Sequence, residues 1–261
     1  MKTYTNRFDL MLKVASDVVP NKALCLDIGC GEGFFCKLLL DKGLNVVGED
    51  LDKQCVELAW NRLKHIQSFH VVHADAQQLP FRTECFNLII CAEVIEHLLS
   101  PSLLMKDIAI TLKAGGKFLL STPNAIGIWN LVFDRLAGCI RNLVLTVSGQ
   151  PKYRSGHISL FTYATLTETL RRFGFAIEGD VGRWRSEGLL IGASLQDSFL
   201  RRFGIDLRGR TLFNVLRRME LEVSRLFPKY LQSGWTLLCT KTVRTAQNFS
   251  DFKKQPFEIS G

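Results

Sequence analysis

Short apolar runs alternate with helix-like segments along most of the chain from Ala23 onward. The apolar runs predict strands at 24–28, 45–50, 69–74, 86–91, 117–121, 175–181 and 235–242. Helical spacing of apolar residues predicts helices at 33–42, 53–65, 103–112, 163–173 and 210–227. Strands that alternate with helices are typical of βαβ units, so the pattern predicts an α/β fold with a mostly parallel, seven-stranded sheet.

The alternation of predicted strands and helices ends after Pro123, and a long apolar stretch follows. Residues 125–148 include Asp134, Arg135 and Arg141, which argue against a transmembrane helix. With 261 residues and 47% hydrophobic positions, one domain is sufficient. We expect a single domain over 1–245, followed by a disordered polar tail at 246–261. Within the domain we expect a core at 22–124, an inserted lid at 125–156 and a C-terminal part at 157–245 that completes the sheet.

The formal net charge of +8 is concentrated in the C-terminal third. Residues 151–245 hold 16 Lys and Arg against 8 Asp and Glu. Arginine suits phosphate and carboxylate groups, so an anionic partner is one interpretation. The other is a solvated helix face, because the arginines of 210–227 fall opposite its apolar stripe. We do not expect nucleic acid as a partner, because no known RNA-binding module accompanies the charge.

The eight cysteines form no Cys-x-x-Cys pair and do not cluster with histidine at ligand spacing. We therefore expect reduced cysteines and no metal site. The first twenty residues lack the apolar stretch and small-residue cleavage site of a secretory signal, so we expect a cytoplasmic protein.

The segment from Leu26 to Gly33 reads as a strand that ends in a glycine-rich turn and opens a helix. Glycine permits the tight turn and lets a ligand approach the backbone, while the helix offers free N–H groups. Asp50 ends the next predicted strand 21 residues after Gly29, as expected of a carboxylate that binds a ribose diol. Together these elements predict a nucleotide-like ligand.

Two departures from the dinucleotide fingerprint identify the type of nucleotide. The third glycine, Gly33, comes one residue too early, and an acidic residue, Asp27, precedes the turn. A carboxylate beside a pyrophosphate would be repelled, whereas beside an amino group or a sulfonium it is favourable. The pattern favours a cationic adenosine compound. The alternative is that Asp27 only caps the glycine turn.

At these residues the sequence resembles the class I S-adenosylmethionine-dependent methyltransferases. The resemblance covers residues 22–124, and its motifs are Asp27–Gly33, Gly48–Asp52, Ala74–Ala76 with Leu79–Pro80, Phe86–Cys91 with Glu93–Leu98, and Leu112–Lys117 with Ser121–Asn124. Asn87 and Ala114 depart from the residues most often found at two positions of the family, and both positions are structural. A segment from His157 to Phe175 is similar to the branch that includes quinone-biosynthesis O-methyltransferases.

The resemblance implies a Rossmann-like, doubly wound fold and S-adenosylmethionine as cofactor. It also implies that Asp27 belongs to the cofactor site, and that Gly29 and Gly31 lie under the methionine part of the cofactor. The other implied contacts lie along the ribose and adenine: Asp50 holds the ribose hydroxyls, Leu51 covers the adenine, Asp75 accepts a hydrogen bond from its exocyclic amine, and Ala92 closes the pocket. Ala76, next to Asp75, is also implied to belong to the cofactor site.

Methyl transfer from a sulfonium needs an in-line nucleophile, so proximity and exclusion of water supply most of the catalysis. A general base is required only for hydroxyl or ammonium acceptors. We consider His157 first and His97 second for that role, with loop or packing roles as the alternatives. Glu93 and Glu96 would share a face if their segment were helical, where they could orient a substrate or support the cofactor loop.

The insertion at 125–156 should determine the methyl acceptor, because loops beyond the carboxyl ends of the strands line the pocket in such sheets. Its Trp129, Leu131, Val132 and Phe133 favour an apolar small-molecule acceptor methylated on oxygen or carbon. A second interpretation is peripheral contact with an anionic membrane through 125–148 and 208–227, and a third is that the apolar residues of the insertion only pack into the core. The pattern is also consistent with an anionic or macromolecular acceptor, and with a non-catalytic domain that binds the cofactor. The oligomeric state cannot be derived from the sequence.

Overall fold

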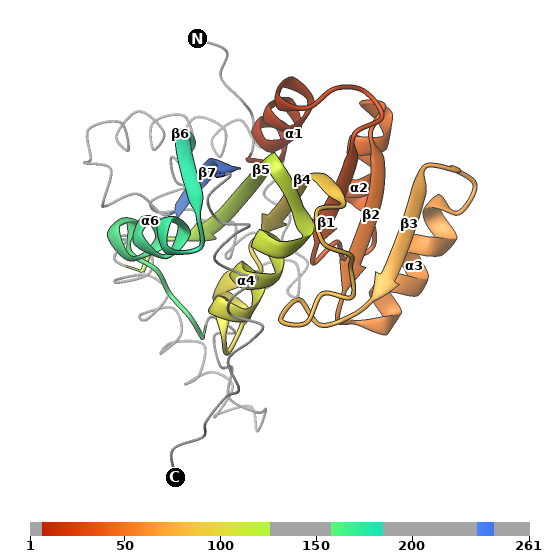
Figure 1. Cartoon of the computed structure of the whole chain (residues 1–261). Helices are drawn as coiled ribbons and strands as arrows, with labels where there is room; N and C mark the ends of the chain where they lie inside the picture. The colour runs from red at the N-terminus through yellow and green to blue at the C-terminus, as the bar shows by residue number, and fades with distance from the viewer. Residues whose placement is uncertain (1–6, 126–157, 185–233, 243–261) are drawn as a thin grey trace, which may run out of the picture.

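The computed structural model describes residues 7–125, 158–184 and 234–242, and these form a seven-stranded sheet with helices on both faces (Figure 1). The strand order is β3-β2-β1-β4-β5-β7-β6. β1 to β5 pair in parallel, whereas β7 is antiparallel to both of its neighbours. The predicted α/β, Rossmann-like, mostly parallel sheet is confirmed.

The strands match the predicted runs closely. Their bounds are β1 Leu24–Ile28, β2 Asn45–Asp50, β3 Phe69–His73, β4 Phe86–Ala92, β5 Leu112–Pro123, β6 Phe175–Trp184 and β7 Gly234–Lys241. The helices are α1 Arg7–Val18, α2 Phe34–Asp41, α3 Lys53–Leu63, α4 Pro101–Thr111 and α6 Tyr163–Arg172, with a 3₁₀ turn, η1, at Ile95–His97.

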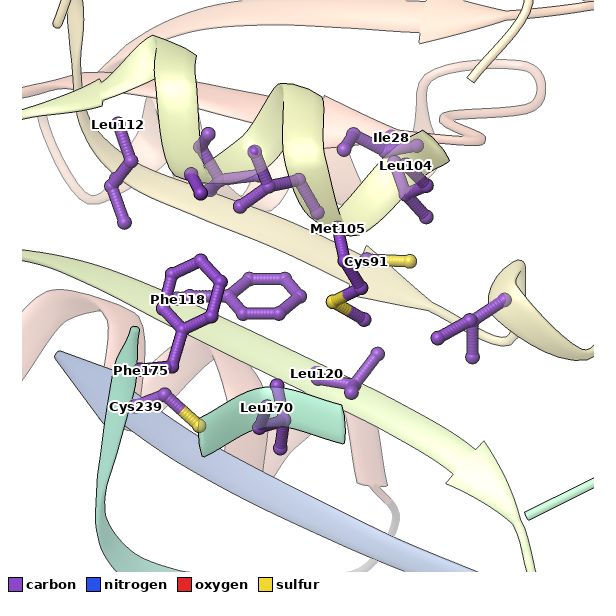
Figure 2. Packing of buried hydrophobic residues seen from close by; sticks show 14 of the residues in the cluster. Ile28, Cys91, Leu104, Met105, Leu112, Phe118, Leu120, Leu170, Phe175 and Cys239 are labelled. Carbon is purple, nitrogen blue, oxygen red and sulfur yellow. The ribbon is translucent and has the colours of Figure 1, made fainter. Parts of the chain in front are cut away.

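Successive side chains of the central strands pack alternately into two separate hydrophobic cores, one on each face of the sheet. On β1, Cys25 packs toward α1, α2 and α3, while Leu26 and Ile28 pack toward α4 and α6. Figure 2 shows this second core, in which Met105 of α4 lies beside Cys91 of β4. Because both faces of the parallel strands are covered, their sequences read as nearly continuous apolar runs.

The expected strand at 117–121 is longer in the structure. β5 begins at Leu112, which pairs with Phe86, and the pairing resumes only at Leu88 with Lys117. The extra residues between the two pairs form a bulge around Gly115, whose φ of 71° is in the left-handed region. These residues therefore belong to β5 as an irregularity inside the strand.

Asn87 has a structural role at the position where the sequence departs from the family. Asn87 Oδ1 accepts hydrogen bonds from the Leu24 backbone N–H and from Lys113 Nζ, each at 3.1 Å, and thereby joins β4 to β1. Seven cysteines lie in the described ranges, and all are free thiols. Among the residues that the structure describes, none of the helices is long and apolar enough to cross a membrane.

Several predicted features lie outside the described residues. These are the lid insertion beyond Ala125, the amphipathic helix 210–227, the tail 246–261 and the candidate base His157. The division of the chain into a core, a lid and a C-terminal part therefore stays a prediction.

Candidate cofactor site

The predicted cofactor residues gather at one edge of the sheet, where β1 to β4 reach their carboxyl ends. The strand register places Ile28 beside Glu49 and Cys91, and Asp50 beside His73. The segments that follow these four strands therefore meet at this edge, which is where open α/β sheets bind ligands. The predicted residues at the edge are Asp27, Gly29, Gly31, Asp50, Leu51, Asp75, Ala76 and Ala92.

The turn after β1 needs glycine for two different reasons. Gly29 and Gly31 have φ of 68° and 53°, a region that side chains with a Cβ rarely adopt. A Cβ on Gly29 would also lie 2.4 Å from Val94 Cγ2, so the turn packs closely against the segment after β4. A Cβ on Gly31 would meet no atom of the described residues within 4 Å, which leaves space for a ligand at the backbone.

Asp50, at the end of β2, forms a hydrogen bond with the glycine turn after β1. Its Oδ2 accepts a hydrogen bond from the Gly31 N–H at 2.8 Å, and its Oδ1 accepts one from the Asp52 N–H at 2.9 Å. The side chain is half-buried, and each carboxylate oxygen has further acceptor capacity. Asp50 can therefore position the turn and still accept hydrogen bonds from ribose hydroxyls.

Asp27 is buried on the face of β1 that packs against α2. Its Oδ2 accepts a hydrogen bond from Cys36 Sγ at 3.2 Å. Burial raises the pKa of Asp27 to about 7; the Cys36 hydrogen bond lowers it, and the nearby charge of Asp50 raises it further. At neutral pH this carboxyl is therefore divided between its neutral and charged forms. A cationic ligand at this edge would favour the charged form.

Glu49 is a buried acid that the motif analysis did not single out. The residue is 1% exposed, and neither carboxyl oxygen has a hydrogen-bond partner among the residues that the structure describes. Burial raises the pKa of Glu49 to about 8, and the charges of Asp50, Asp75 and Asp27 also raise it. The nearby Gly29 N–H lowers the pKa, although it does not form a hydrogen bond with the carboxyl. The strand alternation on β2 could have revealed it, since Glu49 shares a face with Val47, which packs against the α4 core.

The adenine-side residues line the more open part of the edge. Leu51 is 67% exposed immediately after β2. Asp75 is exposed and accepts a hydrogen bond from the Gln77 N–H at 2.8 Å, while the neighbouring Ala76 is buried. Ala92, at the end of β4, is half-buried. An exposed leucine beside an exposed carboxylate suits the face and the amine of an adenine ring.

The acidic residues after β4 do not share a helical face. Glu93 has φ of 59°, so the chain leaves the strand in a left-handed conformation, and η1 starts only at Ile95. Ser121 Oγ donates to Glu93 Oε1 at 3.3 Å, and Thr122 Oγ1 donates to Glu96 Oε2 at 3.1 Å. The two carboxyls thus connect this segment to the end of β5, which favours the supporting role.

His97 lies at the end of η1 with its side chain 46% exposed, and its Nε2 is 3.9 Å from Glu96 Oε1. The backbone oxygen of Glu96 accepts hydrogen bonds from the N–H groups of Ile158 and Ser159. The structure therefore brings His97 close to the segment that directly follows His157. His65, His70 and His73 are exposed around the edge strand β3, as expected for surface residues.

Comparison with known proteins identifies the family. A family profile described as "Methyltransferase domain" matches residues 6–179. The chain belongs to this methyltransferase domain family. A probable S-adenosylmethionine-dependent methyltransferase of Mycolicibacterium smegmatis is 27% identical over 164 residues, which are 63% of this chain and 56% of that protein. The ubiquinone biosynthesis O-methyltransferase of Coxiella burnetii is 32% identical over 111 residues, which are 38% of this chain and 43% of that protein.

The chain spans about half the length of these curated relatives. Among solved structures, the YcgJ protein of Bacillus subtilis is similar with a TM-score of 0.59 and 19% identity, over 90% of this chain and 97% of that one. The expected family, the fold and S-adenosylmethionine as cofactor are confirmed. The individual cofactor contacts remain predictions. The open space at Gly31 and the unpartnered carboxyl of Glu49 both fit a polar ligand at this edge.

Proposed function

We propose that this protein is an S-adenosylmethionine-dependent methyltransferase whose acceptor is an apolar or lipid-like small molecule, methylated on oxygen or carbon. The proposal rests on one observation: an edge that suits an adenosine cofactor lies beside exposed apolar side chains. The Ser100 N–H, next to the exposed Leu99, donates to Gln77 Oε1 at 2.8 Å, and Gln77 follows Asp75 by two residues. The edge and the apolar side chains would hold the two reactants on the same side of the sheet.

Each proposed cofactor residue would contact a different part of the cofactor. Asp50 would accept hydrogen bonds from the ribose hydroxyls, and Asp75 would accept one from the adenine amine. Leu51 would cover the ring, and Ala92 would limit the pocket at the end of β4. Asp27 would supply negative charge on the α2 side of β1.

The proposed acceptor surface consists of Leu99, Leu103, Ile158 and Leu160, which are 76%, 46%, 59% and 44% exposed. These residues come from two segments that lie side by side, because Ser159 Oγ donates to the Leu98 carbonyl at 2.8 Å. Exposed apolar side chains that gather in this way favour an apolar ligand. The ubiquinone biosynthesis enzyme among the relatives supports the same class of acceptor.

When bound, S-adenosylmethionine supplies an electrophilic methyl group. The protein's own contribution would be to hold the acceptor in line with that group and to exclude water from it. A hydroxyl acceptor must also lose a proton, and we assign that role to His157 or His97. An acidic carbon acceptor would need the same base.

We also propose a cytoplasmic location with peripheral contact to anionic membranes through 125–148 and 208–227. A lipid-like acceptor would be reached from such a surface, and the arginines of 208–227 suit anionic headgroups. Binding to vesicles that contain phosphatidylglycerol should weaken as salt is raised. Binding that is absent at low salt would refute the membrane contact.

Calorimetric titration with S-adenosylmethionine and with S-adenosylhomocysteine tests the cofactor site. The Asp50→Ala variant should lose at least about 100-fold in affinity, because two charge-assisted hydrogen bonds contribute about 1.5 to 3 kcal/mol each. Asp52→Ala is the matched control: it removes a carboxylate two residues away, whose Oδ1 accepts a hydrogen bond from the Gln54 N–H. Full affinity in the Asp50 variant, or equal losses in both variants, would refute the assignment.

A screen for S-adenosylhomocysteine release tests the acceptor. Phenols and quinols with alkyl tails should be methylated, whereas carboxylated glycans and RNA should not. Replacing Leu99 with Asn should raise the KM for the alkylated acceptor without changing cofactor affinity. Leu58→Asn on α3 is the matched control, because Leu58 is an exposed leucine outside the proposed acceptor surface. Turnover of anionic acceptors alone would contradict the proposal.

A further inference from the structure

The side chain of Glu49 has two buried oxygen atoms, and neither has a hydrogen-bond partner among residues 7–125, 158–184 and 234–242. Leaving a buried polar group unpaired costs free energy, so nearly all such groups in folded proteins have partners. Because neither oxygen of Glu49 is paired within the described part of the chain, we look for a ligand that supplies the partner.

Glu49 lies where such a partner would be the cofactor. It is the residue before Asp50 on β2, and in register it lies between Ile28 of β1 and Val72 of β3. Its side chain points to the α4 face, because the neighbouring Gly48 faces the thiols of Cys30 and Cys36 on the opposite side.

The groups around Glu49 are the proposed cofactor residues. Asp50 on β2, Asp27 on β1 and Asp75 after β3 are the acids whose charges act on it, and the Gly29 N–H lies near its carboxyl. On β4, Cys91 is the titratable group that interacts with it, and that thiol is buried. Burial and the three acids together favour a neutral Glu49.

We propose that Glu49 is a further cofactor-binding residue, which acts as a neutral carboxylic acid and donates a hydrogen bond to an acceptor atom in the adenosine part of the cofactor. This inference rests on the proposed cofactor site and extends it. Asp50 and Asp75, as carboxylates, only accept hydrogen bonds, so they match the hydroxyl and amine donors of adenosine. The ring nitrogens and the ribose ring oxygen are acceptors, and Glu49 provides the donor that they require.

Binding of 5′-methylthioadenosine across pH 6.5 to 9.5 tests the inference. This probe contains the adenosine part but has no amino acid group that titrates in this range. The wild-type Kd should roughly double by about pH 8, where half of Glu49 has lost its proton, and should then rise by up to tenfold for each further pH unit. The Asp27→Asn variant should retain this rise, which separates Glu49 from the buried acid on β1.

Two substitutions at Glu49 separate hydrogen bonding from packing. Glu49→Gln keeps a donor that cannot ionise, so its Kd should stay within about threefold of wild type at pH 7.5 and should not rise above pH 8. Glu49→Met keeps the volume without the donor, so its affinity should fall about tenfold at pH 7.5 and should not depend on pH. Circular dichroism would establish that each variant is folded.

The possible results lead to distinct conclusions. If the Met variant binds as tightly as wild type, or if the Gln variant keeps the rise in Kd above pH 8, the inference is wrong. The proposed cofactor site would still stand if Asp50→Ala lost affinity in the same assay. If wild-type protein binds neither the probe nor S-adenosylmethionine, both proposals are wrong. If the Met variant does not fold, the pH profile of the Gln variant decides alone.

Discussion

Replacing Glu49 with Gln should make the protein more stable in alkaline solution than the wild type. The pKa of Glu49 is raised from 4.5 to about 8 in the folded state, chiefly by burial. Between these two values, the folded protein holds a proton that the unfolded chain releases. The free energy of unfolding therefore decreases as the pH rises from 4.5 to about 8, and this group causes no further loss above that value.

The size of the effect follows from the interval between the two pKa values. Each pH unit lowers the free energy of unfolding by up to about 1.4 kcal/mol, which gives about 5 kcal/mol over the whole interval. Water that reaches the ionised carboxyl reduces this value, so we expect about 2 to 5 kcal/mol. The Gln variant is free of this loss, because an amide does not ionise in this range.

Urea unfolding without cofactor, followed by circular dichroism between pH 5 and 9, measures the effect. Wild type and Glu49→Gln should have similar stability near pH 5 and diverge steadily toward pH 8. Glu57→Gln, which removes an exposed glutamate of α3, should follow the wild-type profile. Parallel profiles for wild type and the Glu49 variant would show that Glu49 ionises normally in the folded protein, and the reasoning would be refuted.

Three further predictions address the glycine turn, the second buried acid and a helix cap. Gly29→Ala should destabilise the protein by at least about 1 kcal/mol more than Gly31→Ala, as measured by thermal unfolding. Both substitutions place alanine in a left-handed backbone conformation, but only the Cβ at position 29 would clash with Val94. Asp27→Asn should raise the free energy of unfolding at pH 8.5 but not at pH 4, because the pKa of Asp27 is raised to about 7; equal effects at both pH values would contradict this. Thr162→Ala should cost about 1 kcal/mol, because Thr162 Oγ1 accepts a hydrogen bond from the third residue of α6, and cofactor affinity should not change; urea unfolding and calorimetry provide the two readouts.

The strands and the glycine turn could be predicted from the sequence because their signals are local. β1 and β2 are buried on both faces, so each stands out as an apolar run bounded by polar residues. The turn after β1 requires glycine for its backbone angles, and that requirement is visible in the residue types themselves.

Other features depend on contacts that no single segment determines. The helix α1 was not predicted, although Met11 and Ala15 are buried at helical spacing. The burial of Glu49 depends on which face of β2 is covered by α4, and in the sequence it appears only as one more acid beside Asp50. The place of β7 between β5 and β6 arises from pairing across more than a hundred residues, which periodicity cannot reveal.

The position of β7 has a consequence for how the protein is made. Its strand, Gly234–Lys241, is inserted between β5 and β6 and pairs with both. Until residue 241 has left the ribosome, β5 and β6 each present an open edge, and such edges invite pairing with other chains. The half of the sheet that holds the cofactor edge can assemble early, but the whole sheet closes only after β7 has been synthesised. A chain stopped at residue 179, where the family match ends, would keep every proposed cofactor residue and yet aggregate.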